Sequence, residues 1–133
     1  MKAHVKNIIG GTALGLALLA PAIPLWAGFG GFHPVNIFSG NNVGAAGSLQ
    51  SARYSSDNSQ HIGCVVAEAT AYSYVRCTAQ DINGTWMTCK TADPKYIAVA
   101  HAMTSHSAIT FSMPYGSSTC GFIQVINGSP YLR

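Results

Sequence analysis

The side chains best suited to acid–base or metal chemistry in this chain are histidines. Four of the five histidines follow the N-terminal apolar segment: His33, His61, His101 and His106. Hydrolysis by paired histidines and a lysine would need His61, His101 or His106 to meet Lys90 or Lys95, and their spacing does not predict that meeting. As metal ligands, His101 and His106 are the nearest pair, but a five-residue helical step turns them about 140° apart. The sequence therefore predicts no metal site and no cofactor.

Carboxylates and nucleophiles give no stronger signal. The chain has four acidic residues, and they are scattered rather than paired: Asp57, Glu68, Asp81 and Asp93. Acid–base catalysis by carboxylates draws on groups held close together. Serine is frequent, but no G-x-S-x-G nucleophile elbow occurs. The sequence therefore favours a protein that is not an enzyme, and a small secreted hydrolase or toxin that uses the histidines is the alternative.

The four cysteines are better explained as structural staples than as nucleophiles or zinc ligands. They are Cys64, Cys77, Cys89 and Cys120, and no C-x-x-C spacing occurs among them. An even cysteine count behind an export signal predicts two disulfides. Neighbouring strands favour Cys64–Cys77 with Cys89–Cys120, while Cys77–Cys89 with Cys64–Cys120 is nearly as good, so the pairing stays open.

Residues 1–27 have the three parts of a cleavable signal peptide, namely a basic start, an apolar middle and small residues at the exit. We expect cleavage after Ala27; cleavage after Ala22 stays open because residues 20–22 fit the small-x-small rule better. An uncleaved anchor is disfavoured by two prolines late in a run that is barely long enough to span a membrane. The leader is of bacterial type, and it predicts a secreted or periplasmic protein with no membrane span after cleavage.

The charge of the chain falls almost to neutral once the leader is set aside. The whole sequence carries seven Lys and Arg against four Asp and Glu, a formal charge of +3. Lys2 and Lys6 belong to the leader, which leaves a charge of +1. A nucleic-acid partner is not expected, because such a partner requires several cationic contacts to phosphates.

Residues 28–48 are expected to form a Gly-rich flexible arm, because glycine makes ordering of a segment entropically costly. Its aromatic residues are unusual for a pure linker, and they suggest docking on the arm's own domain or on a neighbouring subunit. The arm is therefore the candidate element for homo-oligomerisation.

Residues 49–133 are expected to form one disulfide-stabilised, β-rich domain. Apolar residues alternate over 61–68, 71–79 and 85–91, which predicts three strands. A three-residue hairpin loop, residues 82–84, would place Cys77 opposite Cys89 with both inward, whereas a two-residue loop would force a lysine inward. We therefore expect the three-residue loop.

The rest of the domain reads as a helix and two more strands. Asp93 is a good N-cap, Pro94 suits the first helical position, and the following apolar residues recur at helical spacing. Residues 107–113 and 120–126 alternate as strands. The predicted fold is α+β: a small antiparallel sheet of about five strands, with one helix packed on one face and two disulfides.

The outward face of this sheet is the surface most suited to binding. Its aromatic rings and cations suit stacking on a sugar or docking of a protein. The predicted ligand-binding residues are Tyr72, Tyr74, Arg76, Trp86 and Lys90. The alternative is that these aromatic residues cover a second side of the small core.

The sequence therefore favours an exported, non-enzymatic binding or surface-interaction protein, with self-association through the 28–48 arm as an option. An inhibitor of a secreted enzyme, presenting a rigid loop over residues 114–118, is a further alternative. The chain combines the leader with an Ile-Gly-Cys step, a Cys-x-Ala-x-Asp-x-x-Gly segment and a Cys-x-Thr-x-Asp-Pro segment. In this layout it resembles small exported bacterial proteins of unassigned function. That resemblance implies no activity and no functional residues, and the identity of the ligand is not set by the sequence.

Overall fold

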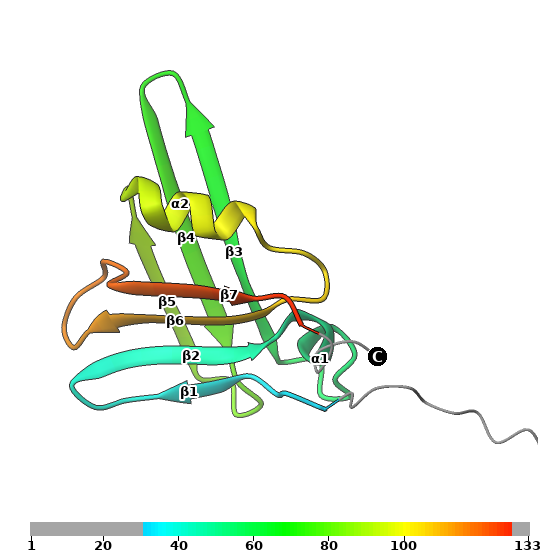
Figure 1. Cartoon of the computed structure of the whole chain (residues 1–133). Helices are drawn as coiled ribbons and strands as arrows, with labels where there is room; N and C mark the ends of the chain where they lie inside the picture. Colours follow the sequence, from blue (N-terminus) through cyan, green and yellow to red (C-terminus); the bar gives the residue numbers. More distant parts are fainter. Residues whose placement is uncertain (1–30, 129–133) are drawn as a thin grey trace, which may run out of the picture.

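The computed structural model describes residues 31–128, which form seven strands and two helices (Figure 1). In chain order the elements are β1 (Asn36–Phe38), β2 (Asn42–Ser48), α1 (Leu49–Arg53), β3 (His61–Ala69), β4 (Tyr72–Gln80), β5 (Trp86–Thr91), α2 (Pro94–His101), β6 (Ala108–Pro114) and β7 (Phe122–Ile126). The expected signal peptide, residues 1–27, lies outside the described residues.

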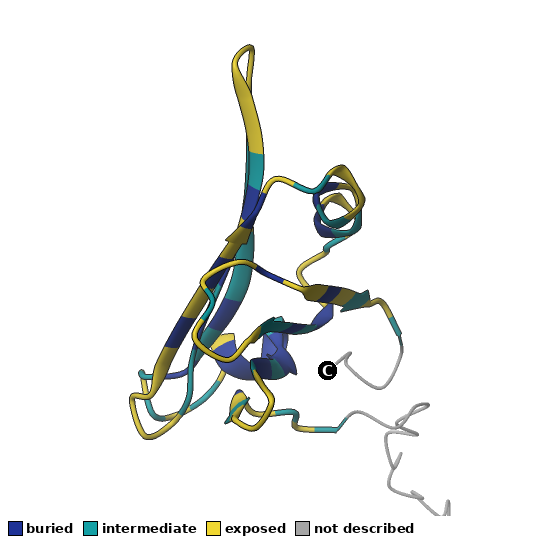
Figure 2. Ribbon diagram, turned by 90° about the vertical axis from the view of Figure 1, so that its left-hand side faces the viewer, coloured by how far each residue is buried: buried dark blue, intermediate teal, exposed yellow. Residues whose placement is uncertain are grey.

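The strands form two antiparallel sheets instead of one. One sheet has the order β1-β2-β6-β7, and the other has the order β3-β4-β5. Figure 1 shows the strands of one sheet running across those of the other, and Figure 2 shows the sheets as separate layers. The expectation of a mostly antiparallel fold with two disulfides is confirmed, whereas the single five-stranded sheet with one helix is only partly right.

The β4–β5 hairpin has the register that the apolar alternation predicts. Cys77 lies opposite Cys89, and Arg76 lies opposite Lys90. Gly84 closes the loop with φ 79°, a left-handed conformation that glycine adopts without strain. This register keeps Cys77 and Cys89 buried at 0% and 2% exposure and leaves Lys90 in solvent.

The disulfides take the pairing that neighbouring strands favour. Cys64 bonds Cys77 across β3 and β4, and Cys89 bonds Cys120, which lies just before β7. The second bond therefore ties the three-stranded sheet to the four-stranded one. No cysteine among the described residues is free.

Helix α2 begins where its capping residue predicts. The backbone N–H of Lys95 donates to Asp93 Oδ1 at 3.0 Å, and Pro94 occupies the first helical turn. Ile97 and Ala100 are buried, and α2 packs on the inner side of β3 and β4 and beside β7. The helix thus extends the layer formed by the four-stranded sheet (Figure 2).

The expected flexible arm is corrected for residues 36–48, which supply β1 and β2. β2 pairs with β6 along its whole length, with Ala45 opposite Phe111. The glycines here serve close packing. A Cβ at Gly44 would overlap the ring of Phe38, and a Cβ at Gly47 would lie 3.0 Å from the Cα of Val35.

Polar contacts at the turn before β3 hold the segment that precedes β1. The Val35 N–H donates to Gln60 Oε1 at 2.7 Å, and Gln60 Nε2 donates to Asp57 Oδ2 at 2.6 Å. Asp57 Oδ1 accepts from the backbone N–H groups of Ser59 and Gln60, each at 2.8 Å. These bonds, first of all those from Gln60, lower the Asp57 pKa from 3.8 to about 2.

The core lies between the two sheets and does not reach the end of the β3–β4 hairpin. Val75 of β4 packs with Ile109 and Phe111 of β6, all at 0–1% exposure. The hairpin continues past α2, and its last residues, 68–73, are all exposed (Figures 1 and 2). The hairpin tip therefore projects from the body of the domain.

Candidate functional site

The outward side chains of the three-stranded sheet form the face that the sequence singled out. On β4, Val75, Cys77 and Ala79 are fully buried, so the residues between them point away from the core. The strand register then defines one surface, here called the outer face. It consists of His61, Gly63, Val65 and Ala67 on β3, Tyr72, Tyr74, Arg76, Thr78 and Gln80 on β4, and Trp86, Thr88 and Lys90 on β5.

All five predicted binding residues lie on the outer face. Tyr72 and Trp86 are 60% and 55% exposed, Arg76 and Lys90 are exposed, and Tyr74 is half-buried. Seen from the edge in Figure 2, the other elements all lie on the opposite side of this sheet. Within residues 31–128, no element packs over the aromatic residues of the outer face.

Tyr74 is the centre of one cluster on this face. The Lys90 Nζ atom lies 3.8 Å from the centroid of the Tyr74 ring, and Arg76 Cζ lies 5.8 Å from it. The rings of Tyr72 and Tyr74 are stacked, with centroids 5.9 Å apart. Such cation–π and ring contacts contribute about 0.5–1 kcal/mol each at exposed sites, and they favour one arrangement of these side chains before any ligand arrives.

A second cluster lies at the opposite end of the outer face. The rings of Trp86 and His61 are 4.6 Å apart between centroids, and they reach each other across Gln80 of the central strand. Between the two clusters Thr78 and Thr88 are paired across the strands, and Thr88 Oγ1 donates to the Cys77 carbonyl at 3.1 Å. The middle of the face thus carries hydroxyl groups.

A shallow cavity of about 370 Å³ lies against the Tyr74 cluster. It is lined by Tyr72, Ser73, Tyr74, Lys90 and Ala92. Its lining combines a ring surface, a hydroxyl group and an ammonium group. This combination can bind a small polar group that also offers an apolar side.

The outer face is cationic. Arg76 and Lys90 lie opposite each other across β4 and β5. Among the described residues of these three strands the only acid is Glu68, and it turns to the inner side, where its Oε1 lies 3.1 Å from His101 Nε2 of α2. The face therefore offers an anionic group two cations and no described opposing carboxylate.

Sequence reasoning did not single out the contribution of β3 to this face. Val65 is 64% exposed and lies opposite Arg76, and His61 completes the Trp86 cluster. The same alternation that turns Ile62, Cys64 and Val66 inward places these residues outward. The signal was therefore present in the sequence.

The histidines proposed for hydrolysis take separate partners. His61 contacts Trp86, His101 contacts Glu68, and His106 Nδ1 lies 3.1 Å from Ser105 Oγ. Lys95, one of the two lysines considered with them, forms an ion pair with Asp93 at 3.3 Å. Within the described part of the chain, no three His, Cys, Asp or Glu side chains are grouped in a way that could hold a metal ion.

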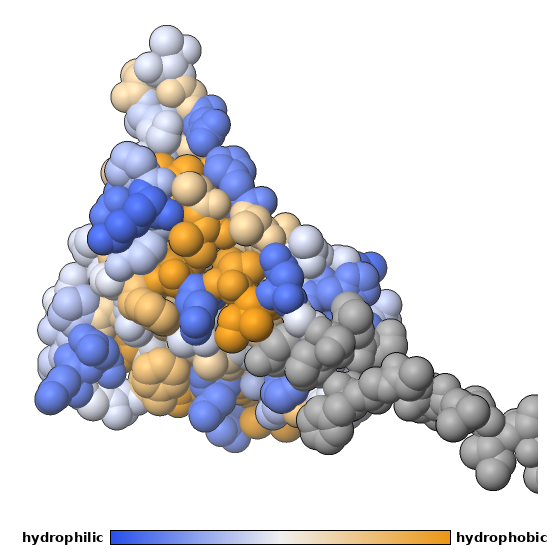
Figure 3. Space-filling view, in the orientation of Figure 1, coloured by the Kyte–Doolittle hydropathy of each residue, from blue (hydrophilic) through white to orange (hydrophobic). Residues whose placement is uncertain are grey.

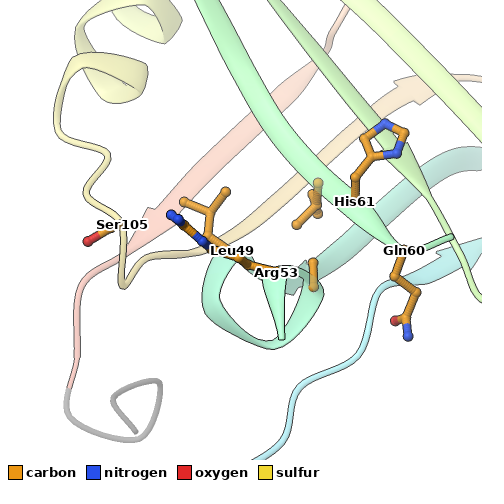
Figure 4. Close-up of a pocket in the computed structure, with 7 residues that line it drawn as sticks. Leu49, Arg53, Gln60, His61 and Ser105 are labelled. Atoms are coloured by element: carbon orange, nitrogen blue, oxygen red, sulfur yellow. The ribbon is translucent and has the colours of Figure 1, made fainter. Parts of the chain in front are cut away.

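A second cavity, of about 270 Å³, lies between α1 and the start of β3 (Figure 4). It is lined by Leu49, Ala52, Arg53, Gln60, His61, Ile62 and Ser105. In Figure 4 the His61 ring turns away from the side where Ser105 lies. The cavity therefore does not bring a histidine to a hydroxyl group.

The opposite side of the molecule has an apolar surface of its own. Figure 3 shows hydrophobic side chains gathered over the region of α2 and β7. Phe122 and Ile126 of β7 are 45% and 36% exposed, and Val99 and Met103 are partly buried beside them. One cation–ring contact lies in this region, with Lys95 Nζ 4.8 Å from the centroid of the Tyr96 ring, whereas the two described ring–ring contacts lie on the outer face.

Within residues 31–128, no helix is long and apolar enough to cross a membrane. Comparison of the chain with models of protein families, with curated proteins and with solved structures finds no match.

Proposed function

We propose that this chain is an exported, non-enzymatic binding protein that holds its ligand against the outer face. The observation that carries the proposal is the pair of preformed clusters on that face, Tyr74 with Lys90 and Trp86 with His61. Patches of large aromatic rings that are exposed to solvent mark interaction surfaces. Aromatic side chains also contribute much of the binding free energy at such surfaces.

The sheet beneath the clusters supports the proposal because it is held rigidly. A disulfide joins β3 to β4, and the segment before β7 bonds to the backbone of Lys90 on β5. Side chains that are fixed before binding lose little conformational freedom in the complex. A small domain can therefore gain useful affinity from a few rings.

A carbohydrate is the ligand class that fits this face best. Trp86 and Lys90 are four residues apart on β5, which separates the two clusters by roughly 14 Å. The hydroxyl groups of Thr78 and Thr88 lie between them. Rings stack on the apolar faces of sugars, while hydroxyl and ammonium groups bond to sugar hydroxyls. A protein ligand would use the same rings but would not need the intervening threonines.

The disulfides also support an oxidising location. Cys77, Cys89 and Cys120 are buried, and Cys64 is half-buried. Bonds of this kind persist in secreted and periplasmic proteins. Together with the leader predicted over residues 1–27, they favour export by a bacterial-type pathway.

One observation favours a second candidate function, inhibition of a secreted enzyme. Tyr115 is 78% exposed at the tip of the turn after β6, and its N–H donates to the Asn41 carbonyl at 3.2 Å. Gly116 has φ 77°, so the turn is tight and well defined. Loss of an inhibitory activity in Tyr115→Ala, with the outer face intact, would support this second function.

The test of the main proposal compares Trp86→Ala and Tyr72→Ala with Tyr54→Ala. Tyr54 is 64% exposed at the end of α1 and is absent from the outer face, so it is a matched aromatic control. Binding is measured on a glycan array and on cells, beside a thermal melt of each variant. We expect each outer-face variant to weaken binding about tenfold or more and to shift the free energy of unfolding by less than about 1 kcal/mol.

The outcomes separate the candidates. Binding to cells that falls in both variants while the glycan array gives no signal would identify a protein ligand. Stability losses of about 3 kcal/mol with unchanged binding per folded molecule would mean that the rings serve the core. That result would remove the outer face from consideration.

A further inference from the structure

One edge of the three-stranded sheet is open. β3 pairs with β4 on one side only. None of the backbone hydrogen bonds described outside the sheets involves residues 61–69. Leu49 lies beside the first part of this edge, since a Cβ at Gly63 would meet its Cδ2 atom at 3.9 Å. From residue 64 to residue 69, no other strand or backbone group of the described residues pairs with this edge.

The strand geometry identifies the backbone groups on the open edge. The Cα atoms of Cys64 and Cys77 are 4.0 Å apart, close to the short spacing of a non-hydrogen-bonded pair. The alternation agrees on the other side of the sheet, where the N–H and C=O of Lys90 point away from β4 to Ser118 and Cys120. The N–H and C=O groups of Cys64, Val66 and Glu68 therefore point outward from the edge.

The other sheet edges in the described part of the chain are short or covered. β1 has three residues. β5 is bonded through Lys90 to residues 118 and 120, and it carries the Cys89–Cys120 disulfide. β7 lies beside α2, whose Tyr96 hydroxyl donates to the Gly121 carbonyl. β3 alone combines nine residues with an open edge.

β3 has few of the devices that usually keep an edge strand from pairing. It contains no lysine, arginine or proline. Its one inward-pointing charge, Glu68, is such a device, but this residue lies near the hairpin tip with His101 Nε2 3.1 Å from its Oε1 atom. Val65 is 64% exposed. Edge strands that remain solitary are normally shortened, bulged, or marked by lysine or proline.

We propose that the open edge of β3 pairs antiparallel with the same strand of a second copy of this chain. Twofold symmetry places one residue opposite its own counterpart. When residues 65–69 of one strand pair antiparallel with residues 65–69 of the other, the residue at the midpoint is Ala67. Val66 then lies opposite Glu68 of the copy, and each such pair exchanges both N–H···O bonds. Glu68 meets an apolar residue and never its own counterpart.

This pairing makes one six-stranded sheet with a continuous outer face. Ala67 lies opposite Tyr74 within the chain, so the row across the junction reads Tyr74, Ala67, Ala67 of the second copy, Tyr74 of the second copy. The small side chains leave the rings room to approach. The junction joins two outer faces, but the inference stands on the edge of β3 and does not rest on the proposed function.

The first measurement is the mass of the exported protein in solution, by sedimentation over a concentration series. We expect a monomer–dimer equilibrium. A monomer at every concentration would overturn the proposal.

The register is tested by charge at the symmetry axis. Ala67→Lys places two lysines against each other and Ala67→Glu places two glutamates, so each variant alone should be monomeric. A mixture of the two should recover the dimer, because lysine then lies opposite glutamate. Ile82→Lys adds the same charge at an exposed position of the β4–β5 loop and should dimerise like the parent.

Each remaining outcome decides the matter as well. Dimers that persist in Ala67→Lys would show that another surface, such as residues 28–48, joins the copies, and would overturn the proposal. If Ala67→Lys fails to fold, Glu68→Pro replaces it, since proline removes an edge-facing N–H and leaves the bonds to β4 in place. Loss of the dimer in Glu68→Pro but not in Glu68→Ala would support pairing through the backbone, and equal dimers in both would refute it.

Discussion

Substitution of Gly44 by alanine tests whether residues 36–48 belong to the folded domain. A Cβ at this position would overlap the ring of Phe38 and would lie 2.9 Å from the carbonyl oxygen of Phe111 on β6. The ring can swing aside, because Phe38 is 40% exposed, but the carbonyl oxygen belongs to a central strand of the sheet. Overpacking of this kind lowers the free energy of unfolding by about 1–3 kcal/mol. For a domain of this size, each kcal/mol lowers the Tm by about 4–8 °C.

Gly40→Ala is the matched control for this experiment. A Cβ at Gly40 would meet only the Asn42 carbonyl oxygen, at 4.0 Å, so the domain should keep its stability. Thermal and denaturant unfolding of both variants, followed by circular dichroism, gives the comparison. If residues 36–48 formed a flexible arm, the two substitutions would have the same effect on the free energy of unfolding. Equal midpoints for Gly44→Ala and Gly40→Ala would therefore refute the close packing of β2 on β6.

Replacement of Cys89 and Cys120 by alanine should lower the free energy of unfolding by about 4 kcal/mol, because this bond closes a loop of 31 residues. Opening the β3–β4 disulfide should cost about 3 kcal/mol, because that bond closes only 13 residues. Denaturant titration measures both losses, and a reversed order would contradict the chain-entropy explanation. Asp93→Ala should cost about 1 kcal/mol through loss of the α2 cap and should leave ligand binding unchanged; an unaltered melt would show that the helix does not need this cap. The hydrogen bonds from Gln60 hold the Asp57 pKa at about 2, against 3.8 when unperturbed, so their contribution is complete above pH 3.8 and is lost as the pH falls toward 2. Between pH 3.8 and about pH 2, the Tm of Asp57→Asn should fall less steeply with decreasing pH than the Tm of the parent protein. Equal slopes of Tm against pH would exclude Asp57 as a contributor to acid unfolding.

The β4–β5 hairpin could be predicted from sequence because each of its signals is local. Gly84 supplies the left-handed residue of the turn, and only one register keeps Cys77 and Cys89 inward while leaving Lys90 in water. The start of α2 was equally readable, since Asp93 and Pro94 carry the capping signal within two residues. Where the signal lies within one hairpin or one turn, sequence reasoning succeeds.

The second sheet could not be predicted, because its central pairing joins distant parts of the chain. Ala45 lies opposite Phe111, and no local pattern marks either as the partner of the other. Glycines at 44 and 47 suggest flexibility in a sequence, whereas here they permit the close approach of Phe38 and Val35. Glycine has both uses, and only the neighbouring side chains distinguish them.

The candidate site was predictable in orientation but not in its contacts. Alternation along β4 and β5 placed Tyr74, Trp86 and Lys90 on one face, and the structure places them there. The ring contact of His61 with Trp86 depends on the register of β3, and that register follows from the Cys64–Cys77 bond. The alternation along β3 shows which of its side chains point outward, but the sequence left that bond open, so the register that brings His61 beside Trp86 could not be fixed.

The β3–β4 hairpin carries both the Tyr74 cluster and the open edge, and a lone hairpin is only marginally stable in water. Val75 is fully buried, but from Tyr74 to the tip no residue on β4 is buried. The Cys64–Cys77 bond lies on the core side of Val75, where it closes the base of the projecting part. Opening this bond should therefore loosen the tip, the aromatic cluster and the edge together. In the Cys64→Ala, Cys77→Ala variant, hydrogen exchange should rise more at residues 65–74 than the loss of global stability alone would produce, and an equal rise in all strands would refute this local effect.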